Sequence, residues 1–233
     1  MDPRFLMPVD LWLISLGQDA TVSPADLGDA QDRRRCEQIL VPGRRRQFAF
    51  RRQSLRYVLS RYLPRFSLAF EKNGKPYVRT SSGRGGLRFS TSSSRDVCAV
   101  CVCHEGETGV DVEAHPPSVD LAGVVRQFLS AAVDGGAVEA DAAAAALPKN
   151  FRQHLAVMSW CRLEAHTKLH GRTLHEVLFE APNTLLPQAF SGRTHHAVAV
   201  ANLEHVCVIA QKEPFHVARV HQLDFSRIAH EQA

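Results

Sequence analysis

Two short stretches of this sequence place acidic and basic side chains at spacings that could bind a metal ion and a phosphate ester. Residues 109–113 read GVDVE, an alternation of apolar and acidic residues typical of a strand with one polar face. Asp111 and Glu113 are therefore expected on the same side, with Cα atoms about 6–7 Å apart. In the later stretch WCRLEAHTK, a helix would put Glu164 and Lys168 one turn apart on one face. Oxygen ligands suit Mg²⁺, which takes further oxygens from water or a substrate phosphate, so the two stretches indicate a phosphate-ester reaction.

Each stretch taken alone also has an ordinary structural explanation. An acidic alternating strand is usually the solvated face of a sheet. Glu164 and Lys168 could form an exposed helical ion pair worth about 0.3–0.5 kcal/mol. Neither pattern by itself specifies a metal site.

The order of these stretches along the chain resembles that of the 4'-phosphopantetheinyl transferases, whose signature motifs read GxDxE and WxxKExxxK. The first motif is matched by Gly109, Asp111 and Glu113, and the second by Trp160, Glu164 and Lys168. Three further segments match in the expected order: a GKP motif at Gly74-Lys75-Pro76, a weak match to a strand ending in Ser-His-Ser at 89–92, and an RxxLRxxL-like helix at 44–63. The resemblance spans residues 30 to 180.

The resemblance implies roles for individual residues. It assigns a magnesium ion to Asp111, Glu113 and Glu164, and catalysis to Glu164 and Lys168. It assigns the binding of coenzyme A to Arg45, Arg52, Lys75, Pro76, Ser90, Thr91 and Lys168.

Two positions depart from the family pattern. Thr91 stands where the family usually has a His associated with the coenzyme A phosphates, so we expect the hydroxyls of Ser90, Thr91 and Ser92 to replace that contact. Leu163 stands where the second motif has its first Lys, which removes another charged contact. Because the carboxylates and Lys168 remain, the sequence predicts a divergent but active enzyme.

Arginine is dense between Arg33 and Arg61, where ten arginines accompany a single acid, Glu37. Such a cluster is compatible with a solvated face or with a patch that follows nucleic-acid phosphates. Sparse aromatic residues, the lack of a zinc-finger or RNA-binding motif and a net charge of only +4 argue against nucleic acid as the partner. The resemblance instead assigns Arg52 and Arg45 to the phosphates of coenzyme A, which arginine forks bind well.

The composition is that of an ordinary globular protein. With 233 residues, of which 45% are hydrophobic and 22% charged, the chain can bury a sizeable core. No apolar run approaches the roughly 18 residues of a membrane-spanning helix, and the N-terminus lacks the apolar region of a secretory signal. We therefore expect a cytoplasmic protein without a membrane partner.

The six cysteines fit a reducing compartment. The run CAVCVC could supply zinc thiolates, but a strand would point Cys98 away from Cys101 and Cys103, and no second cysteine pair has ligand spacing. We interpret these residues as buried apolar side chains and predict no disulfide framework.

Periodicity and turn residues predict the order of elements. In the first half we expect a strand over 5–16 interrupted at Pro8, a helix from Ser23 to about Leu40, a helix over 44–63, and strands over 67–71, 75–79, 89–94 and 97–102. The turn 105–108 is expected to join the last of these strands to GVDVE as a hairpin. In the second half we expect a helix over 119–130, an alanine-rich surface insertion over 134–148, a helix over 150–170, an antiparallel pair over 196–200 and 205–210, and a strand over 215–220.

The fold class predicted from these elements is α+β. The resemblance implies two similar halves related by a pseudo-twofold axis, each a small antiparallel sheet packed on a long helix, with coenzyme A in the cleft between them. We expect an N-terminal half over 1–106 with the arginine helix and the GKP and FSTS segments, and a C-terminal half over 107–233 with the metal and catalytic motifs. A chain with two fused halves predicts a monomer.

The reaction that the resemblance implies moves the phosphopantetheine arm of coenzyme A to a serine of an acidic apo carrier protein of the acyl, aryl or peptidyl type. The other product is adenosine 3',5'-bisphosphate, and Mg²⁺ is the expected cofactor. Carriers of fatty-acid, polyketide, pigment or peptide synthesis would suit the sequence equally. The alternative is a catalytically silent relative that binds coenzyme A or a carrier protein, which the departures at Thr91 and Leu163 motivate.

Overall fold

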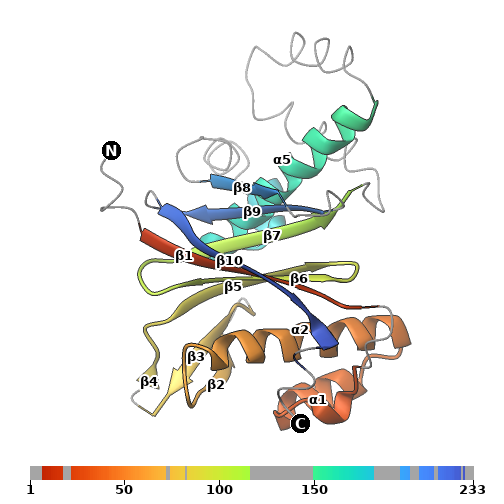
Figure 1. The fold of residues 1–233 in the computed structure, drawn as a ribbon, viewed down its shortest axis with the longest axis vertical. Helices are drawn as coiled ribbons and strands as arrows, with labels where there is room; N and C mark the ends of the chain where they lie inside the picture. The colour runs from red at the N-terminus through yellow and green to blue at the C-terminus, as the bar shows by residue number, and fades with distance from the viewer. Residues whose placement is uncertain are drawn as a thin grey trace.

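The computed structural model describes residues 7–17, 22–71, 74–81, 83–115, 149–180, 195–199, 205–212, 215–226 and 228. Its elements form four layers, in which two sheets lie face to face and a long helix covers the outer face of each (Figure 1). The helix expected over 119–130 and the insertion over 134–148 lie outside the described residues. None of the described helices combines the length and apolar character needed to cross a lipid bilayer.

The first sheet lies at the centre of the molecule. Its strands run in the order β10-β1-β6-β5, with bounds β1 Met7–Ser15, β5 Arg88–Ser94, β6 Val97–Cys103 and β10 Phe215–Asp224. Every residue of β6 is buried, because its even-numbered side chains pack toward α2 (Pro42–Ser60) and its odd-numbered ones toward the second sheet. This alternation places Cys98 opposite Cys101 and Cys103, as predicted, and all six cysteines are free and buried.

The second sheet carries the acidic motif. Its strands run in the order β7-β9-β8, with bounds β7 Thr108–Ala114, β8 His195–Ala199 and β9 His205–Gln211, all antiparallel. The outer helix α5 spans Lys149–Leu169 and packs on β7 and β9. A π-helical turn, η3 (Glu176–Glu180), follows it.

The predicted hairpin between 97–102 and GVDVE is wrong. β6 pairs with β1 on one side and β5 on the other, so neither of its edges is open to β7. The chain instead crosses from one sheet to the other at Glu105–Glu107 and pairs β7 with β9. The motif strand therefore lies across from β6 rather than beside it.

The strand predicted near 215–220 exists, but it belongs to the first sheet. β10 pairs with β1 in parallel, from Met7 opposite Phe215 to Ser15 opposite Asp224. This sheet is therefore mixed rather than antiparallel as expected. The fold is mixed α+β with several small sheets, while the similarity of two halves and the boundary at 106/107 stay predictions.

The helix expected from Ser23 to Leu40 is interrupted. A 3₁₀ turn, η2 (Pro24–Asp26), precedes α1 (Ala30–Glu37), because the Asp29 carboxylate caps α1 by accepting from the backbone N–H groups of Gln31 and Asp32 at 2.8 and 3.1 Å. The next helix, α2, begins at Pro42, two residues before the predicted start, since proline is well tolerated in the first helical turn. A third sheet, β2 Ser67–Phe70, β3 Pro76–Thr80 and β4 Gly83–Arg84, follows α2.

Candidate active site

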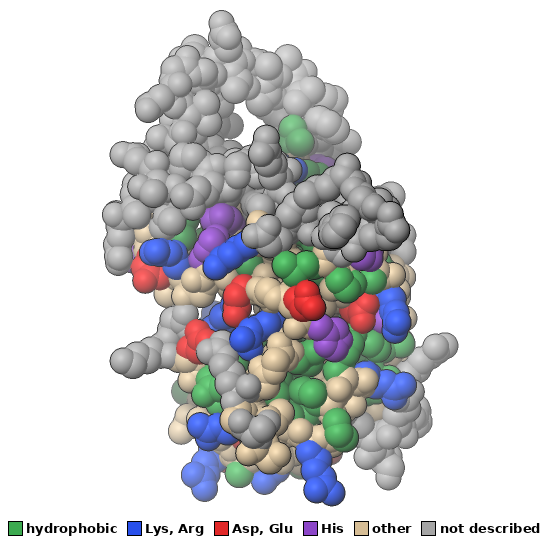
Figure 2. Space-filling model, turned by 90° about the vertical axis from the view of Figure 1, so that its left-hand side faces the viewer, with side chains coloured by type: hydrophobic (Ala, Val, Ile, Leu, Met, Phe, Trp, Pro, Cys, Tyr) green, Lys and Arg blue, Asp and Glu red, His purple; other side chains and the backbone are tan. Residues whose placement is uncertain are grey.

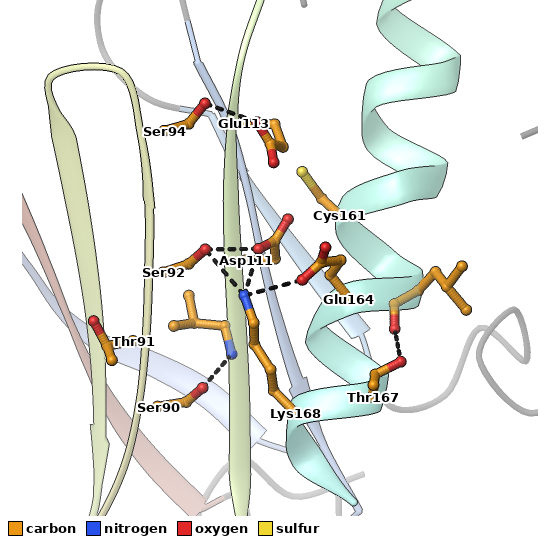
Figure 3. Close-up of polar contacts among 12 residues, drawn as sticks. Ser90, Thr91, Ser92, Ser94, Asp111, Glu113, Cys161, Glu164, Thr167 and Lys168 are labelled. Atoms are coloured by element: carbon orange, nitrogen blue, oxygen red, sulfur yellow. Dashed lines mark hydrogen bonds and ion pairs between the residues drawn. The ribbon is translucent and has the colours of Figure 1, made fainter. Parts of the chain in front are cut away.

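The strand β7 directs its two acidic side chains toward α5, as the alternation predicted. Val110 and Val112 are buried between the two sheets, whereas Asp111 and Glu113 lie on the opposite face, toward the helix (Figure 3). The predicted solvated face is absent at Asp111, which is only 1% exposed.

Gly109 allows strand and helix to approach closely. A Cβ atom at this position would overlap the carbonyl group of Ala165 and lie 2.7 Å from the backbone nitrogen of Leu169. The motif glycine is therefore a packing requirement of the β7–α5 contact, and this contact brings Asp111 near Glu164 and Lys168.

The helix α5 presents Glu164 and Lys168 in its last turns. It ends in a Schellman arrangement, in which the N–H of Gly171 bonds to the carbonyl of Lys168 at 3.2 Å and the N–H of Arg172 to that of Thr167 at 3.0 Å. Gly171 has a φ of 61°, the left-handed conformation that this ending requires. The predicted helix and its glycine end are confirmed.

Lys168 lies at the centre of a polar cluster (Figure 3). Its Nζ donates to Asp111 Oδ1 at 2.6 Å and to Ser92 Oγ at 3.0 Å, and it lies 3.4 Å from Glu164 Oε2. The Lys168 side chain is 28% exposed, so the cluster reaches the surface on this side. The alternative in which Glu164 and Lys168 form only an exposed helical ion pair is therefore excluded.

Burial and mutual repulsion raise the pKa values of two acids of this cluster, Glu164 and Glu113. Burial raises the pKa of Glu164, and the negative charge of Asp111 raises it further against the opposing effect of Lys168. Burial also raises the pKa of Glu113, with added repulsion from Asp111 and Glu164. Burial lowers the pKa of Lys168, but its attraction to the two acids outweighs this and leaves the pKa above its ordinary value.

A row of serines on β5 holds the edge of β7, and the sequence did not reveal this role. Ser92 donates to Asp111 Oδ1 and Ser94 to Glu113 Oε2, each at 2.7 Å. Ser90 and Ser94 also accept from the backbone N–H groups of Val110 and Ala114 at 3.0 and 3.1 Å. These alternate residues of one strand therefore link the two sheets through hydroxyl groups; we name them the serine row (Ser90, Ser92 and Ser94).

Two adjoining cavities lie beside this cluster. One has a volume of about 190 Å³ and is lined by Phe48, Arg51, Arg52, Leu55, Phe70, Gly74, Pro76, Thr91 and Ser92. The other has a volume of about 230 Å³ and is lined by Gly74, Lys75, Pro76, Phe89, Ser90, Thr91, Lys168, Gly171 and Arg172. They share Gly74, Pro76 and Thr91, and none of the described residues that line them is acidic.

Most residues predicted to bind coenzyme A line these cavities. Arg45 does not, because its Nε donates to the carbonyl of Ile39 at 2.9 Å, away from both cavities. Arg51 and Arg172 were not predicted and line one cavity each. In the sequence, Arg51 was marked only by its place in the arginine cluster. Arg172 was marked only by its position just after the glycine that ends the helix.

The two departures from the family pattern differ in their surroundings. Thr91 lines both cavities, with its hydroxyl 3.9 Å from the thiol of Cys98. Leu163 is 5% exposed and belongs to the apolar interior, so the missing lysine of the motif is replaced by a core residue. Only the first departure therefore changes the chemistry of the cavity wall.

The residues present fit a hard cation, although the described residues hold no ready-made group of three or more metal-binding side chains. The Oδ2 atom of Asp111 is buried and makes no hydrogen bond to a described residue. Glu113 and Glu164 add carboxylates whose pKa values are raised chiefly by burial and further by repulsion from the neighbouring acids. Burial raises the pKa of the neighbouring Cys161 thiol well above its ordinary value, so it stays protonated and the donors are oxygens.

Charged side chains are distributed unevenly over the surface. On the face shown in Figure 2, acidic and basic side chains mix across the middle of the molecule. At the lower end, where α1, α2 and the β2–β4 sheet lie in Figure 1, the charged side chains in view are Lys and Arg. The basic end is therefore the one that carries the arginine cluster.

No family model matches this chain. The sequence is similar to the 4'-phosphopantetheinyl transferase HetI of Nostoc sp. strain PCC 7120, with 29% identity over 132 residues. The match covers 52% of this chain and 53% of the relative, so the chain spans about half the length of the curated relative that it matches. The similarity supports the 4'-phosphopantetheinyl transferase superfamily as the one to which this chain is related.

Proposed function

We propose that this protein transfers the 4'-phosphopantetheine arm of coenzyme A to a serine of an apo carrier protein. The observation that carries the proposal is the cluster of Asp111, Glu164 and Lys168 beside cavities lined by cations. The similarity to a phosphopantetheinyl transferase supports the reaction class. We further propose an acyl, aryl or peptidyl carrier as acceptor and Mg²⁺ as cofactor.

In this proposal the cavity residues bind the donor substrate. Arg52 and Lys75 attract its phosphates, and Arg51 and Arg172 add positive charge at either side of Thr91. Arg52 is held in place by Asp32, with Nε and Oδ1 3.2 Å apart. Lys75 is similarly held by Glu107, with Nζ and Oε2 2.8 Å apart.

The acids would hold the metal and move one proton. Asp111, Glu113 and Glu164 would bind Mg²⁺, which supplies charge neutralisation at the pyrophosphate. The carrier serine oxygen forms a bond to the β-phosphorus, and the bond from that phosphorus to the oxygen of the adenosine bisphosphate breaks. Glu164 takes the serine proton, for which its raised pKa makes it a stronger base. Lys168 stabilises the negative charge on the leaving phosphate.

The first test is intact-mass analysis of apo carrier proteins incubated with this protein, coenzyme A and Mg²⁺, and again with EDTA. We expect a gain of one phosphopantetheine in the presence of magnesium and none with EDTA. Several carriers that remain apo while coenzyme A binds would support the silent relative and overturn the transferase. Reversion of Thr91→His would then be the first variant to make.

The variant Glu164→Gln tests the proposed base. We expect turnover to fall by about 10²-fold or more, since general base catalysis contributes about 10²–10⁴-fold, while the thermal unfolding midpoint is retained or raised. Near-normal turnover by Glu164→Gln would remove Glu164 from the mechanism.

A further inference from the structure

The connection between α1 and α2 exposes large apolar side chains. Leu40 is 86% exposed and Val41 53%, and both stand in the turn that joins the two helices. We name residues 38–46 the α1–α2 corner. Two adjacent exposed aliphatic residues leave apolar surface in water, and its burial against a partner would be favourable.

Several residues of the corner also weaken the start of helix α2. Val41 stands at the N-cap of α2 and makes no side-chain cap hydrogen bond, whereas Ser, Thr, Asp or Asn at this position would stabilise the helix. The first turn of α2 holds no acid, and the arginine run 44–46 begins within it. Positive charge near a helix N-terminus opposes the helix dipole. Residues that destabilise the local structure are expected at functional sites, such as a surface that binds a partner protein.

The corner is surrounded by positive charge. Arg34 and Arg35 lie in the last turn of α1, and Arg44 and Arg46 begin α2; all four are exposed. The complementary surface is acidic, with an apolar site for Leu40 and Val41.

The corner is joined to the substrate cavity. The Arg35 guanidinium lies 5.1 Å from the ring centre of Phe70, which lines the cavity of about 190 Å³. Arg52 lies over the same ring at 5.0 Å, and Arg45 fixes the corner through its 2.9 Å bond to Ile39. A protein bound at the corner would therefore lie at the rim of the cavity.

We propose that the α1–α2 corner is the docking surface for the acidic carrier protein, with Leu40 and Val41 buried in an apolar site on the carrier and the flanking arginines facing its carboxylates. This inference rests on the proposed function, because the carrier is the acceptor of that reaction. Charge complementarity selects this occupant over a second copy of this basic corner, which would repel itself. The exposed apolar pair selects a protein over nucleic acid, whose backbone offers no apolar site.

The test compares Leu40→Asp with Val220→Asp, a matched control on β10 where the side chain is 47% exposed. The probes are an apo acyl carrier protein and an apo peptidyl carrier protein, each also prepared with its attachment serine changed to alanine. For Leu40→Asp we expect KM for the carrier to rise about tenfold, with KM for coenzyme A and kcat within twofold of wild type. Val220→Asp should leave all three constants unchanged.

Binding to the serine-free carriers separates docking from transfer. Wild-type protein should bind such a carrier without coenzyme A, and Leu40→Asp should weaken that binding about tenfold. If wild type binds the carrier and Leu40→Asp binds it more weakly, but wild type transfers nothing, the proposed function would be overturned and the docking surface supported. Normal transfer with equal carrier KM for both variants would overturn the docking surface alone. A dimer in sedimentation that Leu40→Asp dissociates, or binding of duplex DNA in place of both carriers, would also overturn it.

Discussion

At the scale of single residues, the site depends on hydroxyl groups as much as on charges. Ser92 bonds to both Asp111 and Lys168, and Ser94 bonds to Glu113. Serines that fix the orientation of carboxylates reduce the rearrangement needed when those carboxylates bind a cation. Ser92 and Ser94 therefore act on the acids, whereas the expected phosphate contact of Ser90 and Ser92, which line the cavities, stays a prediction.

The serine row can be tested by Ser92→Ala, with Ser93→Ala as the control on the opposite face of the same strand. Loss of an outer hydrogen bond to a metal ligand typically costs about 10–100-fold in metal affinity. We expect Ser92→Ala to weaken binding of Mn²⁺, followed by electron paramagnetic resonance, by about tenfold or more. Equal Mn²⁺ affinities for Ser92→Ala and Ser93→Ala would show that the hydroxyl does not position Asp111.

The raised pKa of Glu113 predicts a dependence of stability on pH. Because the folded state holds this proton more tightly than the unfolded chain, stability falls as pH rises above the ordinary glutamate pKa of 4.5, and the loss is complete once pH exceeds the raised pKa of folded Glu113. In EDTA we therefore expect Glu113→Gln to unfold at a higher temperature than wild type at pH 7.5, and the difference to shrink toward pH 4.5. A lower melting temperature for Glu113→Gln at pH 7.5 would contradict this assignment.

At the scale of elements, the contact between β7 and α5 defines the site. Gly109→Ala would place a methyl group into the backbone of Ala165, so helix and strand must separate. We expect a loss of about 3 kcal/mol in the free energy of unfolding and a large loss of activity. Denaturant unfolding would measure it against Gly86→Ala, where no atom lies within 4 Å of the added Cβ. A stability equal to that of Gly86→Ala would mean that the contact adjusts without cost.

The elements that the sequence predicted well are those set by local patterns. The alternation of GVDVE and the helical spacing around Glu164 were sufficient to predict β7 and α5, whereas their meeting at one site was expected from the resemblance. The pairing partner of β7 was not predictable, because the preceding strand β5 occupies one edge of β6 and β1, which is distant in sequence, occupies the other. The serine row was missed for the same reason, since its role exists only once β5 lies beside β7. The binding roles assigned from the resemblance stay predictions.

At the scale of the whole molecule, the end of the chain completes the core of its beginning. Phe225 is fully buried and lies edge-on to Phe50 of α2, with ring centres 5.2 Å apart. We expect Phe225→Ala to cost about 3–5 kcal/mol in the free energy of unfolding. Val220→Ala, at an exposed position of the preceding strand β10, should change it by less than about 0.5 kcal/mol. Calorimetric unfolding of the two variants would show whether the last strand is integral to the N-terminal sheet.

The parallel pairing of β1 with β10 also bears on how the protein is made. A ribosome adds about 5–20 residues per second, so β1 is synthesised well before its partner. The edge of β1 that β10 covers therefore stays open until residues 215–224 have left the ribosome. Until then the nascent chain carries an unpaired strand edge, which is a template for association with other chains. The emergence of residues 215–224 from the ribosome, rather than completion of the first hundred residues, sets the moment at which this edge of β1 is protected.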